Sequence, residues 1–175
     1  LFEKKNLPFY KFGDAIYLAK IETKYWIEYI CKRFENTGKH ISPELAEEIC
    51  RLVDNHSSYV QQLSWLLWIR TINTATTEQL SYALEDLLDQ NNILFQSETE
   101  NLSAYQMNFL KAIVDGIHTK FSSKEVISKY HLGTSANIVR LKNALLQKEL
   151  IETNGKEIVL ADRVFEVWFK KEMLY

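Results

Sequence analysis

The chain has 175 residues, which is enough for one large domain or two small domains with buried cores. Its apolar content of 46% and charged content of 25% are ordinary for a globular protein, and five glycines and two prolines argue against disorder and against a glycine-rich active-site scaffold. A formal net charge of -2 excludes a strong overall field for nucleic acid or membranes, and no apolar run approaches the roughly 20 residues of a membrane span.

The first 22 residues are predicted to be a tail or connector rather than an independent unit. Pro8 favours extended backbone before it, and the apolar run Ala15–Leu18 fits a short strand or an extended connector. The segment is too short and too apolar to be stable alone, so we expect it to lie against another part of the protein.

Residues 23–92 are predicted to form a four-helix bundle. The helices are expected at residues 23–35, from the cap Ser42 with Pro43 onward, at residues 58–71, and from the capping box Thr76-x-x-Gln79 to about Gln90. The third is apolar on nearly all sides, including Trp65 and Trp68, and is therefore predicted to be central. Residues 93–102 are predicted to be a linker that is helical in part.

Residues 103–175 read as a winged-helix domain with an added C-terminal helix. Ser103-x-x-Gln106 begins a leading helix, and Ser122 with Glu125 suggests a capping box for the next one. Gly133 suits the tight turn that follows, because it accepts a positive φ. Thr134 or Ser135 is then predicted to cap a third helix.

The wing and the last helix complete this domain. Asn154-Gly155 is a strong two-residue hairpin signal between two short apolar strands that end at Leu160. Asp162 is predicted to cap a final helix, whose wide aromatic face should pack on the winged domain or on the bundle. The predicted fold class is therefore mainly α, a helical bundle followed by a winged helix with a small β-hairpin wing.

The sequence shows no catalytic constellation. It contains neither GxxxxGK[ST] nor GxGxxG, and its four histidines are scattered without metal-ligand spacing. Cys31 and Cys50 lie in helical patterns and are expected to be buried, reduced thiols of a cytoplasmic protein. We expect no enzyme activity, no metal and no cofactor in this chain by itself.

Two groups of residues are candidates for contact with other molecules. The turn before the third bundle helix contains His56, Ser57, Ser58 and Tyr59, where free helix-start amides favour anions and a ring can stack on a base. For His56 an ordinary surface or half-buried histidine at a helix–helix junction is the preferred interpretation, and nucleotide contact is the functional alternative. The third helix of the winged domain presents side chains of the types that read DNA grooves or dock a partner: Thr134, Ser135, Asn137, Arg140, Asn143 and Lys148.

Charge favours a docking role over DNA binding for this helix. Residues 99–175 hold 11 basic and 9 acidic side chains, whereas residues 1–98 hold 10 and 14. A dedicated DNA-binding domain has a denser basic stripe. Docking is therefore the preferred interpretation, and DNA binding is kept as the alternative.

Several short segments carry a resemblance to a known family. The chain resembles the C-terminal half of bacterial and archaeal P-loop ATPases of the AAA/STAND type, akin to archaeal origin-recognition-like ATPases. The matching segments, which follow one another in the family's order, are Asn6-Leu7-Pro8-Phe9-Tyr10, Tyr59-Val60-Gln61-Gln62-Leu63, Leu87-Leu88-Asp89-Gln90-Asn91, Ser122-Ser123-Lys124-Glu125-Val126, Leu132-Gly133-Thr134-Ser135-Ala136-Asn137 and Val164-Phe165-Glu166-Val167-Trp168-Phe169.

The resemblance implies a different role for each segment of the chain. Residues 1–22 would be the tail of an ATPase core, residues 23–92 its helical lid, and the phosphate loop and catalytic acids would belong to a preceding segment. ATP and Mg²⁺ are then expected for the intact protein. In such relatives the turn near the nucleotide reads His-Pro-aromatic-Tyr-x-Gln, whereas this chain has Ser57 and Ser58 in place of the proline and the first aromatic residue. No sensor-type lid arginine stands out, and Arg51 and Arg70 are candidates only by proximity.

The preferred interpretation is a lid and winged helix that act as a nucleotide-state-dependent interaction module of an ATP-binding protein. The expected partners are the missing ATPase core and either DNA or another protein, with no membrane. The alternatives are a free-standing winged-helix DNA-binding regulator, with the bundle as its sensor or dimerisation domain, and a protein–protein adaptor.

Overall fold

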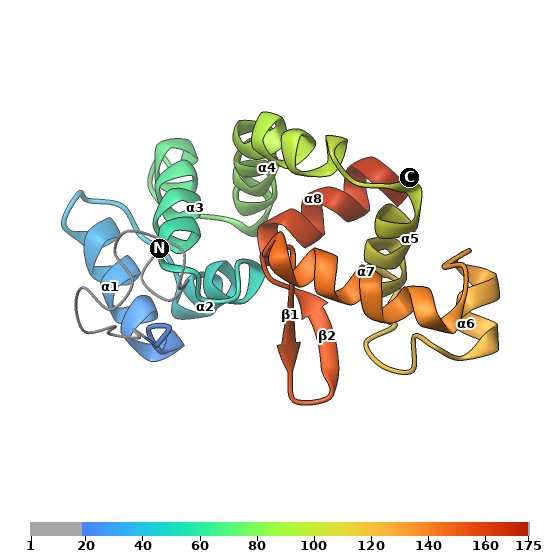
Figure 1. Cartoon of the computed structure of the whole chain (residues 1–175). Helices are drawn as coiled ribbons and strands as arrows, with labels where there is room; N and C mark the ends of the chain where they lie inside the picture. Colours follow the sequence, from blue (N-terminus) through green and yellow to red (C-terminus); the bar gives the residue numbers. More distant parts are fainter. Residues whose placement is uncertain (1–18, 175) are drawn as a thin grey trace, which may run out of the picture.

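A computed structural model describes residues 19–174 as a mainly helical molecule with one small β-hairpin (Figure 1). The expectations for residues 1–18, including the strand or connector at Ala15–Leu18, lie outside the described residues. The first half is a bundle of α1 (Thr23–Glu35), α2 (Pro43–Leu52), α3 (Ser57–Arg70) and α4 (Thr77–Glu100). The second half contains α5 (Ala104–Val114), α6 (Lys124–Lys129), α7 (Ser135–Gln147), β1 (Ile151–Asn154), β2 (Glu157–Leu160) and α8 (Arg163–Leu174).

The bundle is closed at one end by its loops. The loop between α1 and α2 meets the loop between α3 and α4, where the His40 amide donates to the Asn73 carbonyl and the Ala75 amide donates to the His40 carbonyl. The Ser42 hydroxyl accepts from the Leu45 amide, which confirms the predicted start of α2. Its core is built from fully buried side chains of all four helices, Phe34, Ile49, Leu63 and Leu87 among them.

α3 differs from its predicted central position. It packs against α2 and α4, but Trp65 and Ile69 are 55% and 48% exposed. The prediction that apolar residues all around the helix would be buried is wrong for this face, because α1 packs on α2 and leaves one side of α3 open. Cys50 is fully buried and Cys31 is half-buried, and both are free thiols. Burial raises the pKa of the Cys50 thiol to about 11.

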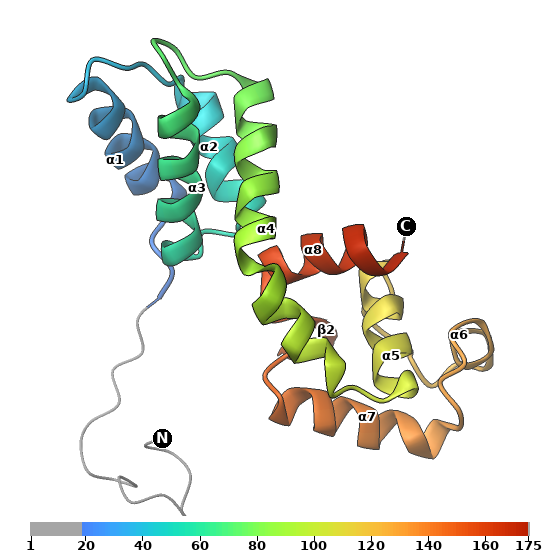
Figure 2. The same cartoon turned by 90° about the horizontal axis from the view of Figure 1, so that it is seen from above.

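α4 is longer than the sequence predicted and joins the two halves (Figure 2). Its capping box at Thr76 and Gln79 is present as expected, but the helix continues past Gln90 to Glu100. Most of the predicted linker at residues 93–102 is therefore helical. Phe95 and Thr99 are buried, because α8 lies across this part of α4.

The winged helix has the predicted order of elements, with differences of one residue at two turns. Ser123, not Ser122, caps α6 through its hydroxyl, and no capping box with Glu125 is formed. In the hairpin Asn154 pairs with Glu157, so Gly155 and Lys156 form the two-residue loop. Gly155 and Gly133 have φ values of +60° and +86°, which glycine accepts without strain.

α8 ties the winged helix to the bundle. The Val164 and Phe165 amides donate to Asp162 Oδ1, which confirms the predicted cap. Its aromatic face is buried against α4, α5 and β2, so both predicted packing partners are used. Phe165 and Trp168 pack against Phe95 of α4 with ring centroids 5.4 and 5.5 Å apart, and Trp168 Nε1 donates to Asn92 Oδ1 at 2.9 Å.

Candidate functional site

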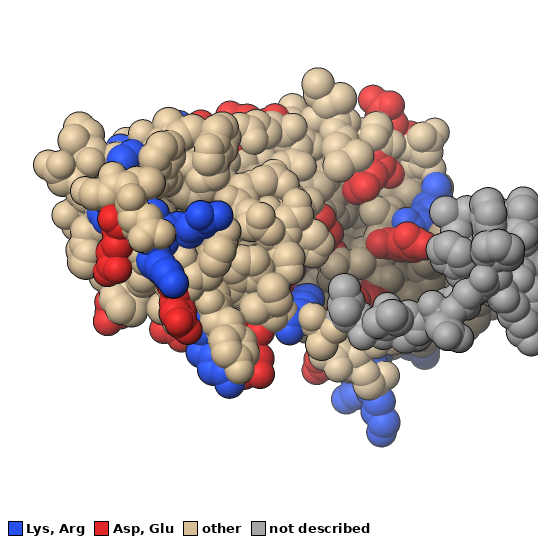
Figure 3. Space-filling view, turned by 90° about the vertical axis from the view of Figure 1, so that its left-hand side faces the viewer, with Lys and Arg blue, Asp and Glu red and all other residues tan. Residues whose placement is uncertain are grey.

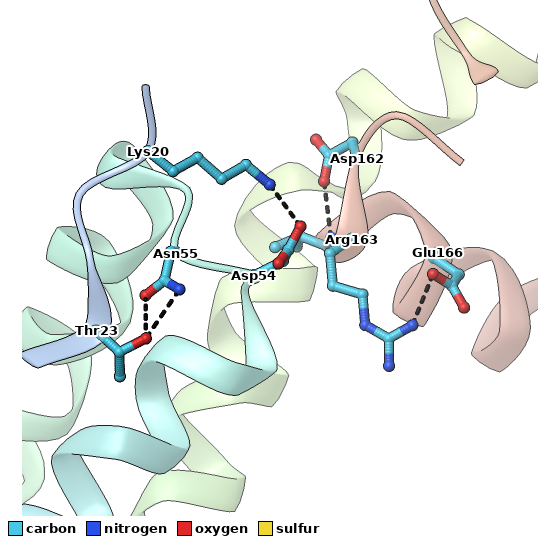
Figure 4. Close-up of polar contacts among 8 residues, drawn as sticks. Lys20, Thr23, Asp54, Asn55, Asp162, Arg163 and Glu166 are labelled. Carbon is cyan, nitrogen blue, oxygen red and sulfur yellow. Dashed lines mark hydrogen bonds and ion pairs between the residues drawn. The ribbon is translucent and has the colours of Figure 1, made fainter. Parts of the chain in front are cut away.

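The turn that begins α3 lies beside the junction between the two halves (Figure 4). His56 is at the cap position of α3, and its side chain makes no capping hydrogen bond. His56, Ser57 and Ser58 are exposed, and no side chain caps the amides of the first helical turn. The predicted residues of this turn therefore lie together, and three of the four are accessible.

Tyr59 is placed differently from the rest of the turn. Its side chain is buried, and its hydroxyl donates to Asp162 Oδ2 at 2.7 Å. Burial, and then the hydrogen bond to Asp162, raise the pKa of Tyr59 well above its ordinary value. The ring centroid lies 4.8 Å from that of His56. Tyr59 thus connects the turn to the start of α8.

Other polar contacts surround the junction. Lys20, just before α1, forms an ion pair with Asp54, and Thr23 Oγ1 accepts from Asn55 Nδ2 at 3.0 Å (Figure 4). These contacts hold the start of α1 beside the turn that begins α3. Arg163, the first residue of α8, forms an ion pair with Glu166. In this way the beginnings of α1, α3 and α8 meet at one end of the bundle.

The two arginines considered as lid arginines are engaged elsewhere. Arg51 forms a bidentate pair with Glu48 on the same helix, and Arg70 forms an ion pair with Asp86 of α4. Among the residues that the structure describes, no group of three His, Cys, Asp or Glu side chains could hold a metal ion. The described residues thus leave the first amides of α3 without a capping side chain and bring no cluster of metal ligands together.

The second candidate surface is the outer face of α7. Ile138, Leu141 and Leu145 are buried, as their spacing predicted, and this turns the opposite face to solvent. Thr134, Ser135, Arg140, Asn143 and Lys148 are exposed along it. Thr134 is at the cap position as expected, although its side chain forms no capping hydrogen bond. These five exposed residues, which run from the N-cap to the C-cap of α7, are called the α7 strip below.

Asn137 has a structural role within this surface. Its Nδ2 donates to the Leu132 carbonyl at 2.9 Å and closes the turn between α6 and α7. A Cβ added at Gly133 would lie 3.2 Å from this nitrogen and 3.4 Å from a ring carbon of Tyr105, so the turn is tightly packed. In the middle of the strip Val139 is 62% exposed, which makes the face mixed rather than basic.

A groove between α1 and α3 was not anticipated from the sequence. It has a volume of about 370 Å³ and includes Tyr29, Phe34, Trp65 and Trp68 in its lining. Figure 3 looks onto this side of the molecule and shows a broad uncharged surface. The open aromatic face of α3 was the available signal, but it was interpreted as core.

Comparisons with known proteins agree with this architecture. A family model described as "Probable winged helix domain" matches residues 93–171. The structure is similar to that of the Walker-type ATPase PABY2304 of Pyrococcus abyssi, with a TM-score of 0.67 and 18% sequence identity over 86% of this chain. The chain covers 42% of that ATPase chain. No curated protein matches the sequence.

These comparisons establish the fold and leave activity open. No described helix is long and apolar enough to cross a membrane. The similarity to the ATPase is at the level of fold, and it extends over more of the chain than the family match does. Residues 93–171 form a winged-helix domain, and the helical bundle that precedes it completes a fold also found as part of a Walker-type ATPase.

Proposed function

We propose that the chain is the C-terminal lid and winged-helix region of an ATP-binding P-loop ATPase of the AAA/STAND type, and that it acts as a nucleotide-state-dependent interaction module. The observation that carries the proposal is the extent of the fold similarity. It covers 86% of this chain but 42% of the Walker-type ATPase chain, which leaves room in that protein for a separate nucleotide-binding core.

In the intact protein, the phosphate loop, ATP and Mg²⁺ would belong to a core that precedes Leu1. The bundle would close over the nucleotide with the turn at His56, Ser57, Ser58 and Tyr59. The three exposed residues of this turn and the free amides of α3 suit an anionic or polar neighbour. The exposed strip of α7 would then dock a partner according to the nucleotide state.

Nucleotide binding by the intact protein tests this proposal. We expect a GxxxxGK[ST] motif about 200 residues before Leu1 in the coding sequence, as domain size suggests. We expect the intact protein to bind ATP by calorimetry, and the 175-residue chain alone to show no binding. Replacing the lysine of that motif by alanine should abolish binding. An intact protein that binds no ATP would refute the proposal.

The exposed strip of α7 also favours a second candidate, a winged-helix DNA-binding regulator. Mobility-shift titrations over a range of salt concentrations separate the two functions. A DNA-binding regulator would show a steep loss of affinity with salt, and the slope would fall by about one for each phosphate-contacting cation removed in Arg140→Ala and Lys148→Ala. Lys170→Ala with Lys171→Ala, on exposed positions of α8, is the matched control. The preferred function predicts weak binding that these variants do not change.

A further inference from the structure

A hydrogen bond joins the turn at His56–Tyr59 to the winged-helix half of the molecule. Tyr59 is the third residue of α3, and its hydroxyl donates to Asp162, which lies 103 positions later in the sequence. The donor side chain is buried and the acceptor is a carboxylate, so this is a charge-assisted bond in a partly desolvated place.

Asp162 uses its two oxygens for two different purposes. Oδ2 accepts from Tyr59, while Oδ1 accepts from the Val164 and Phe165 amides at 2.7 and 3.0 Å. One rigid carboxylate therefore holds both the beginning of α8 and the side chain of α3. A movement of Tyr59 must either break its bond or rotate the carboxylate away from the amides that it caps.

The beginning of α8 is in turn connected to the rest of the winged helix. Phe165 stacks on Trp168 with centroids 5.7 Å apart, and both rings pack on Phe95. Trp168 is also fixed by its hydrogen bond to Asn92. Because these side chains are buried and closely packed, a rotation at the start of α8 requires their rearrangement.

On the outer side, Tyr59 is in contact with the accessible part of the turn. Its ring lies against His56, which is exposed, and Ser57 and Ser58 are exposed beside it. A group that binds at these three residues would press on the His56 ring and, through it, on Tyr59. The chain of contacts from the turn to α8 is thus continuous and short.

We propose that Tyr59 and Asp162 form the link through which occupation of the His56–Tyr59 turn changes the start of α8 and, through it, the winged helix. Tyr59 is a positioning residue in this scheme and does not itself need to touch the nucleotide. The inference rests on the proposed function, since it takes the occupant to be ATP held by a preceding core.

Amide hydrogen exchange in the intact protein, with and without ATP, tests the link. The Val164 and Phe165 amides report directly on the cap that Asp162 provides. In the unaltered protein we expect ATP to change their exchange rates by about tenfold, the size expected when a charge-assisted bond is made or lost. In Tyr59→Phe, measured at saturating ATP, this ATP-dependent change should fall below about twofold.

Two further variants keep the test decisive. Tyr82→Phe removes a hydroxyl from an exposed tyrosine of α4 and should leave the ATP response intact. If Tyr59→Phe does not fold, Asp162→Ser takes its place and should lose the ATP response in the same way, because serine retains one oxygen for the cap but has no second oxygen for Tyr59. Folding of the variants is checked by circular dichroism before exchange is measured.

The outcomes are distinct. An unaltered protein that binds ATP without any change at Val164 and Phe165, or a Tyr59→Phe protein that retains the full change, would overturn the link while leaving the proposed function in place. A protein that binds no ATP would overturn both.

Discussion

At Asp162 one carboxylate accepts from the Tyr59 hydroxyl and from two backbone amides, while a second acid, Glu98 of α4, lies nearby. Burial first, and then the charge of Asp162, raise the pKa of Glu98 above its ordinary value of 4.5. At the junction, the Asp162 carboxylate therefore accepts three hydrogen bonds, whereas the Glu98 carboxylate lies where ionisation is less favourable.

The raised pKa of Glu98 predicts a measurable pH dependence. A folded-state pKa above the unfolded one means that protonation favours the folded state, so its contribution is present below pH 4.5 and is lost as pH rises through the raised value. Glu98→Gln should remove this loss. Urea unfolding at several pH values measures this effect. The difference in free energy of unfolding, Glu98→Gln minus the unaltered chain, should increase between pH 4.5 and 7.

The gain should be small, since Glu98 is only partly buried and solvent screens its interaction with Asp162. Glu100→Gln, at an exposed position at the end of α4, is the matched control and should show no such pH-dependent difference. Parallel pH profiles for Glu98→Gln and the unaltered chain would contradict the assignment.

At the scale of single elements, the cap of α6 offers a direct comparison of two adjacent serines. Ser123 accepts from the Val126 amide, whereas Ser122 is exposed and precedes the helix. Ser123→Ala should lower the free energy of unfolding by about 1 kcal/mol, the usual cost of losing a cap. Ser122→Ala should change it by less than about 0.5 kcal/mol. Urea unfolding of both variants measures these changes. A larger loss of stability in Ser122→Ala than in Ser123→Ala would contradict the assignment of Ser123 as the cap of α6.

Local signals in the sequence were sufficient for most element beginnings. The capping boxes at Thr76 and Ser103 and the cap at Asp162 depend on residues two or three positions apart, and the structure confirms all three. The end of α4 was not predictable in this way. Phe95 and Thr99 are buried by α8, more than 60 positions further along the chain, so tertiary packing rather than a local stop signal decides where the helix ends.

The candidate site was predictable to a similar extent. The spacing of Ile138, Leu141 and Leu145 correctly predicted that these residues are buried and that the opposite face of α7 is exposed. The open face of α3 was missed, because apolar residues on all sides of a helix predict burial without naming the neighbours that provide it. The bond between Tyr59 and Asp162 spans 103 positions, and no periodicity in the sequence indicates such a pair.

At the scale of the whole molecule, bundle and winged helix are mechanically connected at two places. α4 runs without a break from one half into the other, and α8 packs across its second half (Figure 2). The bond between Tyr59 and Asp162 adds a second connection at the end where the chain enters the bundle. An event at the His56–Tyr59 turn is therefore well placed to affect the winged helix.

The central claim is that the bundle closes over a nucleotide bound by a preceding core. Photolabelling of the intact protein with azido-ATP, followed by peptide mass spectrometry, tests it most directly. We predict that the label is found on the peptide that contains His56, Ser57 and Ser58, and that excess ATP competes it away. Labelling that excess ATP does not reduce, or specific labelling confined to the core with none at this turn, would contradict the account.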